Sequence, residues 1–129
     1  MFDKEIYIAK RLRIETNYNG YDVEYFEKPK RYRMNYQPLE GAMTYSRSGE
    51  NTNSTQYVAF VDRNVYQGII RTGDKAYLSD ESVLEEDLKQ LTLYDNEYCE
   101  KANYRVISVL PQNKKMKIVF KKILDSEVL

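Results

Sequence analysis

The sequence predicts a mainly β protein, a small antiparallel β-barrel or sandwich with long loops and at most one short helix. Short runs that alternate apolar and polar residues are typical of strands with one buried face. Turn signals separate these runs, and the strongest is Asn19-Gly20. Tyrosine is abundant, with 13 among 129 residues, and its ring packs on a pleated face while its hydroxyl stays hydrated. The length and the absence of linker composition indicate one domain, residues 1–129.

The first predicted element is an N-terminal hairpin. One strand is expected to bury a face made of Ile6, Ile8, Leu12 and Ile14, which share one parity apart from the interruption at Lys10. A two-residue type I′ turn at Asn19-Gly20 then leads into a strand over 21–25. This loop length predicts the cross-strand pairs Tyr18 with Tyr21, Thr16 with Val23, and Ile14 with Tyr25.

Basic and aromatic residues alternate in the next run, between Pro29 and Pro38. The pattern favours an edge strand, since charges discourage pairing between sheets and proline is tolerated at sheet edges. It also matches a single-strand nucleic-acid site, where bases stack on aromatic rings beside cationic groups. The candidate contacts of that alternative are Lys28, Lys30, Arg31, Tyr32, Arg33 and Tyr36.

A long polar loop is predicted over 39–56, because the segment has too little apolar content to offset its ordering entropy. Loops of this length in compact domains tend to be functional or disordered, and a tolerated insertion is the alternative. Strands are then predicted over 57–61 and 66–71, with Gly68 marking a bulge or a turn. A tight turn at 72–74 leads into the segment 75–78.

The segment that follows fits a helix or a strand. Ser82 followed by Glu85 matches a capping box, and Leu84, Leu88 and Leu91 have helical spacing. The rival is a loop followed by a strand over 88–94, because short apolar runs fit either structure.

The last predicted element is a hairpin over 104–123. A β-rich run ends at a Pro/Asn break over 111–114, and Met116, Ile118 and Phe120 resume the alternation on one face. Charge is polarised here: acids predominate over 74–100, whereas 101–124 contains basic residues and no acid.

Composition argues against an enzyme and against a metal or other cofactor. There is no histidine, which is the commonest general base and the commonest metal ligand. Cys99 is the only cysteine, so an internal disulfide and an all-cysteine zinc site are excluded. The acids Glu85, Glu86 and Asp87 lack the alternating ligand pattern of a calcium loop. We therefore expect a non-catalytic protein.

Charge and hydropathy also bound the partners. The chain has 20 basic and 20 acidic residues, which argues against a general binder of nucleic acid or anionic membranes. Its apolar runs are far shorter than the roughly 20 residues that cross a bilayer, and the charged N-terminus does not match a signal peptide. We expect no membrane partner.

Three further stretches of the sequence are informative: Asn35-Tyr36-Gln37-Pro38-Leu39, Thr72-Gly73-Asp74-Lys75-Ala76-Tyr77-Leu78, and Tyr104-Arg105-Val106-Ile107-Ser108-Val109. With them the chain resembles the head-closure, or stopper, family of connector proteins at the head–tail junction of long-tailed bacteriophages. The resemblance implies a barrel-like subunit in a ring, typically of twelve copies, that closes the DNA-filled capsid and joins it to the tail. Portal and adaptor proteins would lie above the ring and a tail protein below it, in a virion assembled in the host cytoplasm.

The resemblance also implies a loop in the channel, facing double-stranded DNA without reading its sequence. The polar loop is nearly neutral, so it would not bind passing phosphates tightly. The candidate channel residues are Gly41, Tyr45, Arg47, Ser48, Gly49, Glu50, Asn51 and Asn53.

A ring is built from heterologous contacts, in which one face of a subunit meets a different face of the next. The polarised segments provide candidate subunit contacts at Asp80, Glu81, Glu85, Glu86, Lys114, Lys115 and Lys117. Pairing of these segments within one subunit is the competing possibility. For the whole chain, the alternatives are a nucleic-acid-binding β-barrel module and a tail-completion protein of the same junction.

Overall fold

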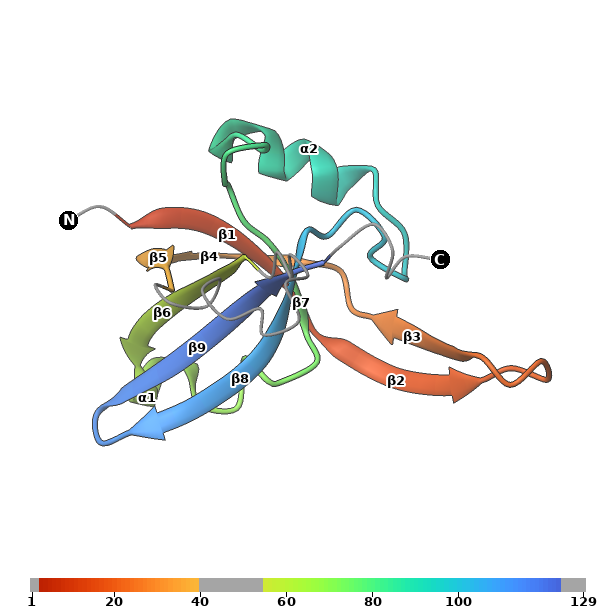
Figure 1. Cartoon of the computed structure of the whole chain (residues 1–129), viewed down its shortest axis with the longest axis horizontal. Helices are drawn as coiled ribbons and strands as arrows, with labels where there is room; N and C mark the ends of the chain where they lie inside the picture. Colours follow the sequence, from red (N-terminus) through yellow and green to blue (C-terminus); the bar gives the residue numbers. More distant parts are fainter. Residues whose placement is uncertain (1–2, 40–54, 124–129) are drawn as a thin grey trace, which may run out of the picture.

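Figure 1 shows the computed structural model, which describes residues 3–39 and 55–123. The predicted mainly β fold is confirmed. The elements in chain order are β1 (Lys4–Ala9), β2 (Arg11–Thr16), β3 (Asp22–Phe26), β4 (Lys30–Met34), β5 (Tyr36–Pro38), β6 (Gln56–Asp62), α1 (Arg63–Tyr66), β7 (Lys75–Tyr77), the 3₁₀ turn η1 (Glu85–Asp87), α2 (Leu88–Leu93), β8 (Tyr104–Gln112) and β9 (Lys115–Lys122).

The main sheet curls into a half-barrel. Its seven strands run in the order β4-β1-β7-β8-β9-β6-β5, and neighbouring strands are antiparallel. The two edge strands, β4 and β5, are separated in the chain by Asn35 alone, so the two edges of the sheet lie close together. The prediction of edge-strand structure between Pro29 and Pro38 is confirmed, but the single predicted strand is wrong, because the chain breaks at Asn35 into β4 and β5 at opposite edges of the sheet.

The concave side of the half-barrel holds the main core, which includes the buried side chains of Ile6, Val106, Ile118 and Phe120. A second cluster lies on the other side of β1 and β7, where α2 contributes its buried Leu88. β1 is consequently buried on both faces along its last four residues. Burial of each large aliphatic side chain stabilises the fold by roughly 1.5–3 kcal/mol.

β2 and β3 leave the half-barrel as a separate two-stranded sheet that projects from one side of the molecule (Figure 1). We call this hairpin, residues 11–26, the arm. The single strand predicted from Ile6 to Ile14 is wrong, since Lys10 separates β1 from β2. Leu12 and Ile14 are 52% and 48% exposed, because β2 pairs with β3 away from the core.

The predicted register of the arm is also wrong, by one residue. Thr16 lies opposite Asp22 and Arg13 opposite Tyr25. The N–H of Gly20 donates to the carbonyl of Asn17, and Gly20 alone of the Asn19-Gly20 pair has positive φ, at +86°. This is a three-residue loop with a left-handed glycine at its end, whereas a type I′ turn needs positive φ at both residues. A shift of one residue moves every side chain to the other face.

The strand predicted over 66–71 is wrong as well. Asp62 caps α1 by accepting the N–H of Asn64 at 2.9 Å, so the chain turns where the strand was expected to follow. The N–H of Ile69 donates to the carbonyl of Tyr66, and Gly68 has a φ of +83°. These bonds make a compact turn around Gly68. Of the two predictions for Gly68, a bulge or a turn, the turn is confirmed.

The predicted helix is present as η1 and α2, and the rival strand over 88–94 is not. The capping box predicted from Ser82 and Glu85 is wrong, since the hydroxyl and the N–H of Ser82 both donate to Asp80 at 2.8 Å. η1 begins after Leu84 with no capping side chain. Leu84 is exposed, although Leu88 is buried as its spacing predicts.

The C-terminal hairpin is confirmed as β8 and β9. Its turn is shorter than predicted, with Asn113 and Lys114 between the strands and Asn113 at a φ of +58°. A bulge between Val106 and Ser108 shifts the alternation, which brings Val109 against the core on the same side as Val106. No helix within residues 3–39 and 55–123 is long and apolar enough to cross a membrane.

Candidate functional site

The arm presents apolar and aromatic side chains to solvent. Tyr18 and Tyr21, at its tip, are 97% and 71% exposed, and Leu12 and Ile14 lie along β2. Tyrosine and large aliphatic groups on a projecting element are typical of protein contact surfaces, because they bury much area and lose little conformational entropy. The sequence-based prediction placed Leu12 and Ile14 in the core, so this surface was missed. The one signal of it was Lys10, which interrupts the alternation.

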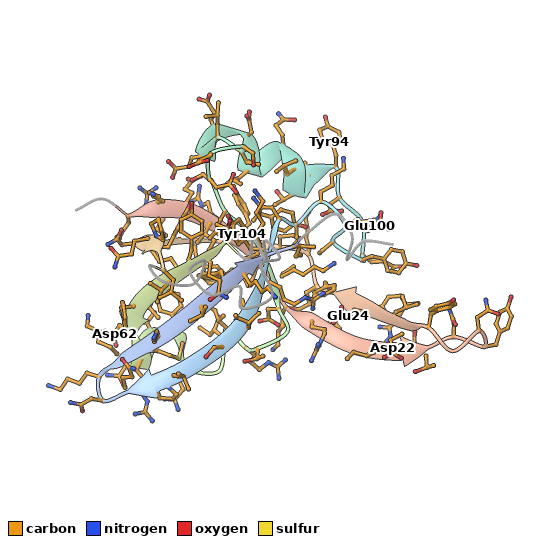
Figure 2. All side chains as sticks on the ribbon, viewed as in Figure 1. Asp22, Glu24, Asp62, Tyr94, Glu100 and Tyr104 are labelled. Carbon is orange, nitrogen blue, oxygen red and sulfur yellow. The ribbon has the colours of Figure 1, made fainter. Side chains whose placement is uncertain are left out.

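A network of charges fixes the base of the arm to the half-barrel. Glu24 accepts two hydrogen bonds from the Arg105 guanidinium, at 3.0 and 2.8 Å, and one from Arg11 at 3.0 Å. Glu24 lies in the middle of β3, closer to the body than Asp22 (Figure 2). Burial opposes ionisation of Glu24, but the bonds from Arg105 and Arg11 outweigh it and lower the pKa of the carboxyl. Glu24 therefore stays ionised and links β2, β3 and β8.

Asp74 is a second anchor and is 1% exposed. Its two carboxylate oxygens accept the N–H groups of Arg11 and Arg71, each at 2.9 Å. Its carbonyl accepts the N–H of Val106 at 2.8 Å. Because these bonds join β2 and β8 through buried groups, the arm leaves the body in a fixed direction.

A cleft of about 500 Å³ lies between the arm and the body. Its lining residues are Asp22, Val23, Glu24, Lys75, Tyr98, Glu100, Ala102, Arg105 and Ile123. The ammonium of Lys75 already donates to the carbonyls of Tyr98 and Cys99, at 3.0 and 3.3 Å. Burial and the nearby charge of Arg105 lower the pKa of Lys75. Arg105 is bound to Glu24, so both cations of this cleft, Lys75 and Arg105, already make hydrogen bonds that stabilise the fold.

One end of the half-barrel is closed by tyrosines around Asp80. The rings of Tyr36, Tyr57 and Tyr104 meet edge to face, with centroids 5.6 and 5.5 Å apart. Asp80 accepts hydrogen bonds from the hydroxyl of Tyr104 at 2.9 Å and from the ammonium of Lys122 at 3.0 Å. Asp80 was a candidate subunit contact, but its side chain is 4% exposed and pairs within the subunit. Its side chain is thus engaged within the subunit, which does not support the predicted subunit contact at Asp80.

The other candidate subunit contacts lie on two separate flanks. Glu81, Glu85 and Glu86 are exposed around η1, where Glu85 also accepts the N–H of Glu5 at 2.5 Å. Lys114 and Lys115 are exposed at the β8–β9 turn, and Lys117 is partly buried nearby. Figure 1 places α2 and this turn on opposite sides of the body.

These flanks do not pair with each other in one subunit. Within the described ranges, none of the three lysines forms an ion pair, and the intrasubunit pairing of the acidic and basic segments is carried by Asp80 with Lys122. Both surfaces are thus available for contacts between molecules.

Only some of the candidate nucleic-acid contacts are exposed and free to bind a ligand. Tyr36 is 1% exposed and its hydroxyl is hydrogen-bonded to Ser79, so its ring cannot serve as a stacking platform. Tyr32 packs against the core and against Tyr66, with ring centroids 6.0 Å apart. Arg31 and Arg33 both pair with Glu5, at 3.4 and 3.8 Å. Lys28 and Lys30 remain exposed without an ion pair to a described residue.

The candidate channel residues Gly41, Tyr45, Arg47, Ser48, Gly49, Glu50, Asn51 and Asn53 lie outside the described residues. The loop that they form is expected to begin beyond β5 and end before β6.

Metal-binding side chains do not gather in one place in the described part of the chain. No group of three or more aspartate, glutamate or cysteine side chains there could hold a metal ion. Cys99 is buried, and burial raises the pKa of its thiol, which disfavours the thiolate.

Comparison with protein-family models, with curated proteins and with solved structures finds no match to this chain.

Proposed function

We propose that this chain is a structural subunit of a bacteriophage head–tail connector, of the head-closure or stopper type. It assembles into a ring that closes the DNA-filled capsid and joins it to the tail. The observation that carries the proposal is the projecting arm with its exposed Tyr18 and Tyr21, fixed to a small half-barrel. The three stretches that resemble the stopper family support the same function.

The opposite charges of the two flanks favour ring assembly. The acids around η1 and the lysines of the β8–β9 turn lie on different sides of the body, so one copy attracts the next head to tail. Complementary charge mainly sets the orientation and the rate of such association, and salt screens it.

The test adds purified protein to a portal–adaptor complex from the same virion and follows assembly by native mass spectrometry. The wild type is expected to form a ring, and Lys114→Glu with Lys115→Glu to assemble more slowly while unfolding at the same temperature. Lys28→Glu with Lys30→Glu is the matched control, since it makes an equal charge change just before and at the start of β4. Binding of a single copy, or no binding, would contradict the proposal.

Binding of labelled single strands separates this function from the nucleic-acid alternative. The connector function predicts no measurable binding at moderate salt. Micromolar affinity with a steep salt dependence, abolished by Lys28→Glu with Lys30→Glu, would favour the alternative. The order in which the ring, the adaptor and the tail protein bind distinguishes a stopper from a tail-completion protein.

A further inference from the structure

We infer that the arm of one copy docks into a groove on the outer face of the half-barrel of the next copy. The inference rests on the proposed function, because it identifies how neighbouring copies in the ring hold each other. The groove has a volume of about 530 Å³ and is lined by Gln37, Pro38, Leu39, Val58, Phe60 and Lys117.

The groove lies on the face of the sheet that points away from the core. Ala59, Ile118 and other inward residues fill the core, so Val58 and Phe60, of opposite parity, point outward. Val58 is only 4% exposed and forms the floor of the groove, whereas Phe60 is exposed to solvent. The register places Phe60 opposite Lys117 and Lys117 opposite Leu110, which makes a row across β6, β9 and β8. Phe60 and Leu110 are 48% and 51% exposed. The row is therefore an apolar surface interrupted by one lysine.

The arm has the dimensions to cover this row. β2 has six residues and so extends about 20 Å at about 3.3 Å per residue. Three adjacent strands span about 10 Å at about 4.8 Å spacing. Ile14 and Tyr18 are exposed over the outer part of the arm, and together with Phe60 and Leu110 they would exclude water from a shared contact.

Charge complementarity favours this groove as the occupied surface. Beyond its anchored base the arm carries Arg13, which pairs with Glu15 at 3.5 Å, and Asp22, which leaves one net negative charge. The outer face of β9 carries Lys115, Lys117 and Lys121, and Asp62 on β6 is the acid beside them. None of these three lysines forms an ion pair with a residue in the described ranges.

The contact must join two molecules. The arm projects from one side of the body, whereas β6, β9 and the β8–β9 turn extend toward the other side (Figure 1). Glu24, bound to Arg105, and Asp74, bound to the N–H of Arg11, hold the arm in that direction. An arm fixed before binding loses little entropy on docking. Because arm and groove are different surfaces, the contact is heterologous and adds one copy after another.

Two variants and their mixture test the inference, with the mass distribution at high protein concentration as the readout. The arm variant is Ile14→Ser with Tyr18→Ser, and the groove variant is Phe60→Ser with Leu110→Ser. Each alone is expected to weaken self-association about 10- to 100-fold, the range expected for loss of central apolar anchors. A mixture has one intact arm and one intact groove, so it should form heterodimers and stop there.

Leu93→Ser with Tyr94→Ser is the matched control, since both residues are exposed on or beside α2 and far from Asp62 at the groove side (Figure 2). It should associate as the wild type does. If a serine variant fails to fold, Tyr18→Cys and Phe60→Cys chains replace it, and an oxidised cross-link between them, absent with Tyr94→Cys, is the expected result.

Three results would overturn the inference: a wild type that stays monomeric at every concentration, an arm variant that associates normally, or a mixture that forms no heterodimer. Arm-to-arm pairing, in particular, would be lost in the arm variant and not restored by mixing. These outcomes leave the proposed function standing if the wild type still forms a ring on the portal–adaptor complex.

Discussion

Asp80 accepts hydrogen bonds from Ser82, Tyr104 and Lys122 while almost fully covered. Burial opposes its ionisation, but these bonds outweigh burial and lower the pKa of Asp80 from 3.8 to about 2. Burial and the neighbouring carboxylate raise the pKa of Tyr104, so the phenol keeps its proton and donates it. One carboxylate therefore joins the strand ends β8 and β9 to the loop after β7.

The lowered pKa of Asp80 predicts a specific pH dependence of stability. A carboxyl whose folded pKa lies below its unfolded value stabilises the fold above the unfolded pKa, and this contribution is lost as pH falls through the folded pKa. A lowering from 3.8 to about 2 corresponds to roughly 2 kcal/mol. We expect Asp80→Asn to reduce the free energy of unfolding by about that amount at pH 7, and the difference from wild type to shrink between pH 4 and pH 2.

Urea unfolding of both proteins across this pH range measures the difference. Glu86→Gln, which changes an exposed acid on η1, is the control and should show little effect at any pH. A difference between wild type and Asp80→Asn that stays constant down to pH 2 would refute the assignment.

Gly73 makes a second residue-scale prediction. Its φ is +101°, and a Cβ there would lie 2.6 Å from the guanidinium carbon of Arg11. Gly20 also has positive φ, but a Cβ there would meet no atom within 4 Å. Both alanine variants suffer backbone strain, and Gly73→Ala should cost about 1–3 kcal/mol more, because it moves Arg11 away from Glu24.

Thermal unfolding of the two alanine variants provides the measurement. In an Arg11→Met background the extra cost at Gly73 should disappear, since the side chain that the new methyl group displaces no longer binds Glu24. Equal costs for Gly73→Ala and Gly20→Ala in the wild-type background would show that Arg11 moves aside freely.

At the scale of elements, the β8–β9 hairpin and β4 were predictable from the sequence, whereas the arm was not. The β8–β9 hairpin and the edge strand β4 follow from local pattern and turn chemistry. The arm does not, because leaving the sheet after Lys10 depends on the anchors Glu24 and Asp74, whose partners are distant in sequence. The register of the arm depends on a choice between turn types that Asn19-Gly20 alone does not make.

The side chain of Asn17 decides that choice. It accepts the N–H groups of Asn19 and Tyr21, each at 3.0 Å, and thereby holds the three-residue loop. Asn17→Ala should speed hydrogen exchange of the arm amides by about tenfold, equivalent to roughly 1 kcal/mol, and leave β8 and β9 unaffected. Thr16→Ala, which removes the bond from its hydroxyl to Asp22 in the strands and spares the loop, is the comparison. Equal exchange in Asn17→Ala and wild type would show that backbone bonds alone fix the loop.

For the whole molecule, the mainly β class was predictable from composition and alternation, whereas the half-barrel and the surfaces that we propose for docking were not. Charge polarisation along the sequence points to Asp80 as a contact residue, but its side chain is 4% exposed and pairs with Lys122. The arm and the outer groove at Phe60 and Lys117 consist of residues whose sequence pattern does not differ from that of other strand residues. Their role depends on which faces the curled sheet leaves uncovered, and one sequence does not specify this.

The central claim is that copies of this chain assemble into a ring through the arm. The most direct test measures the mass of the species that forms on a portal–adaptor complex, for the wild type and for the Ile14→Ser, Tyr18→Ser arm variant. We predict a closed ring of many copies for the wild type, and few or no added copies for the variant at the same concentration and with the same thermal stability. A wild type that adds only a single copy, or a variant that completes the same ring, would contradict assembly through the arm.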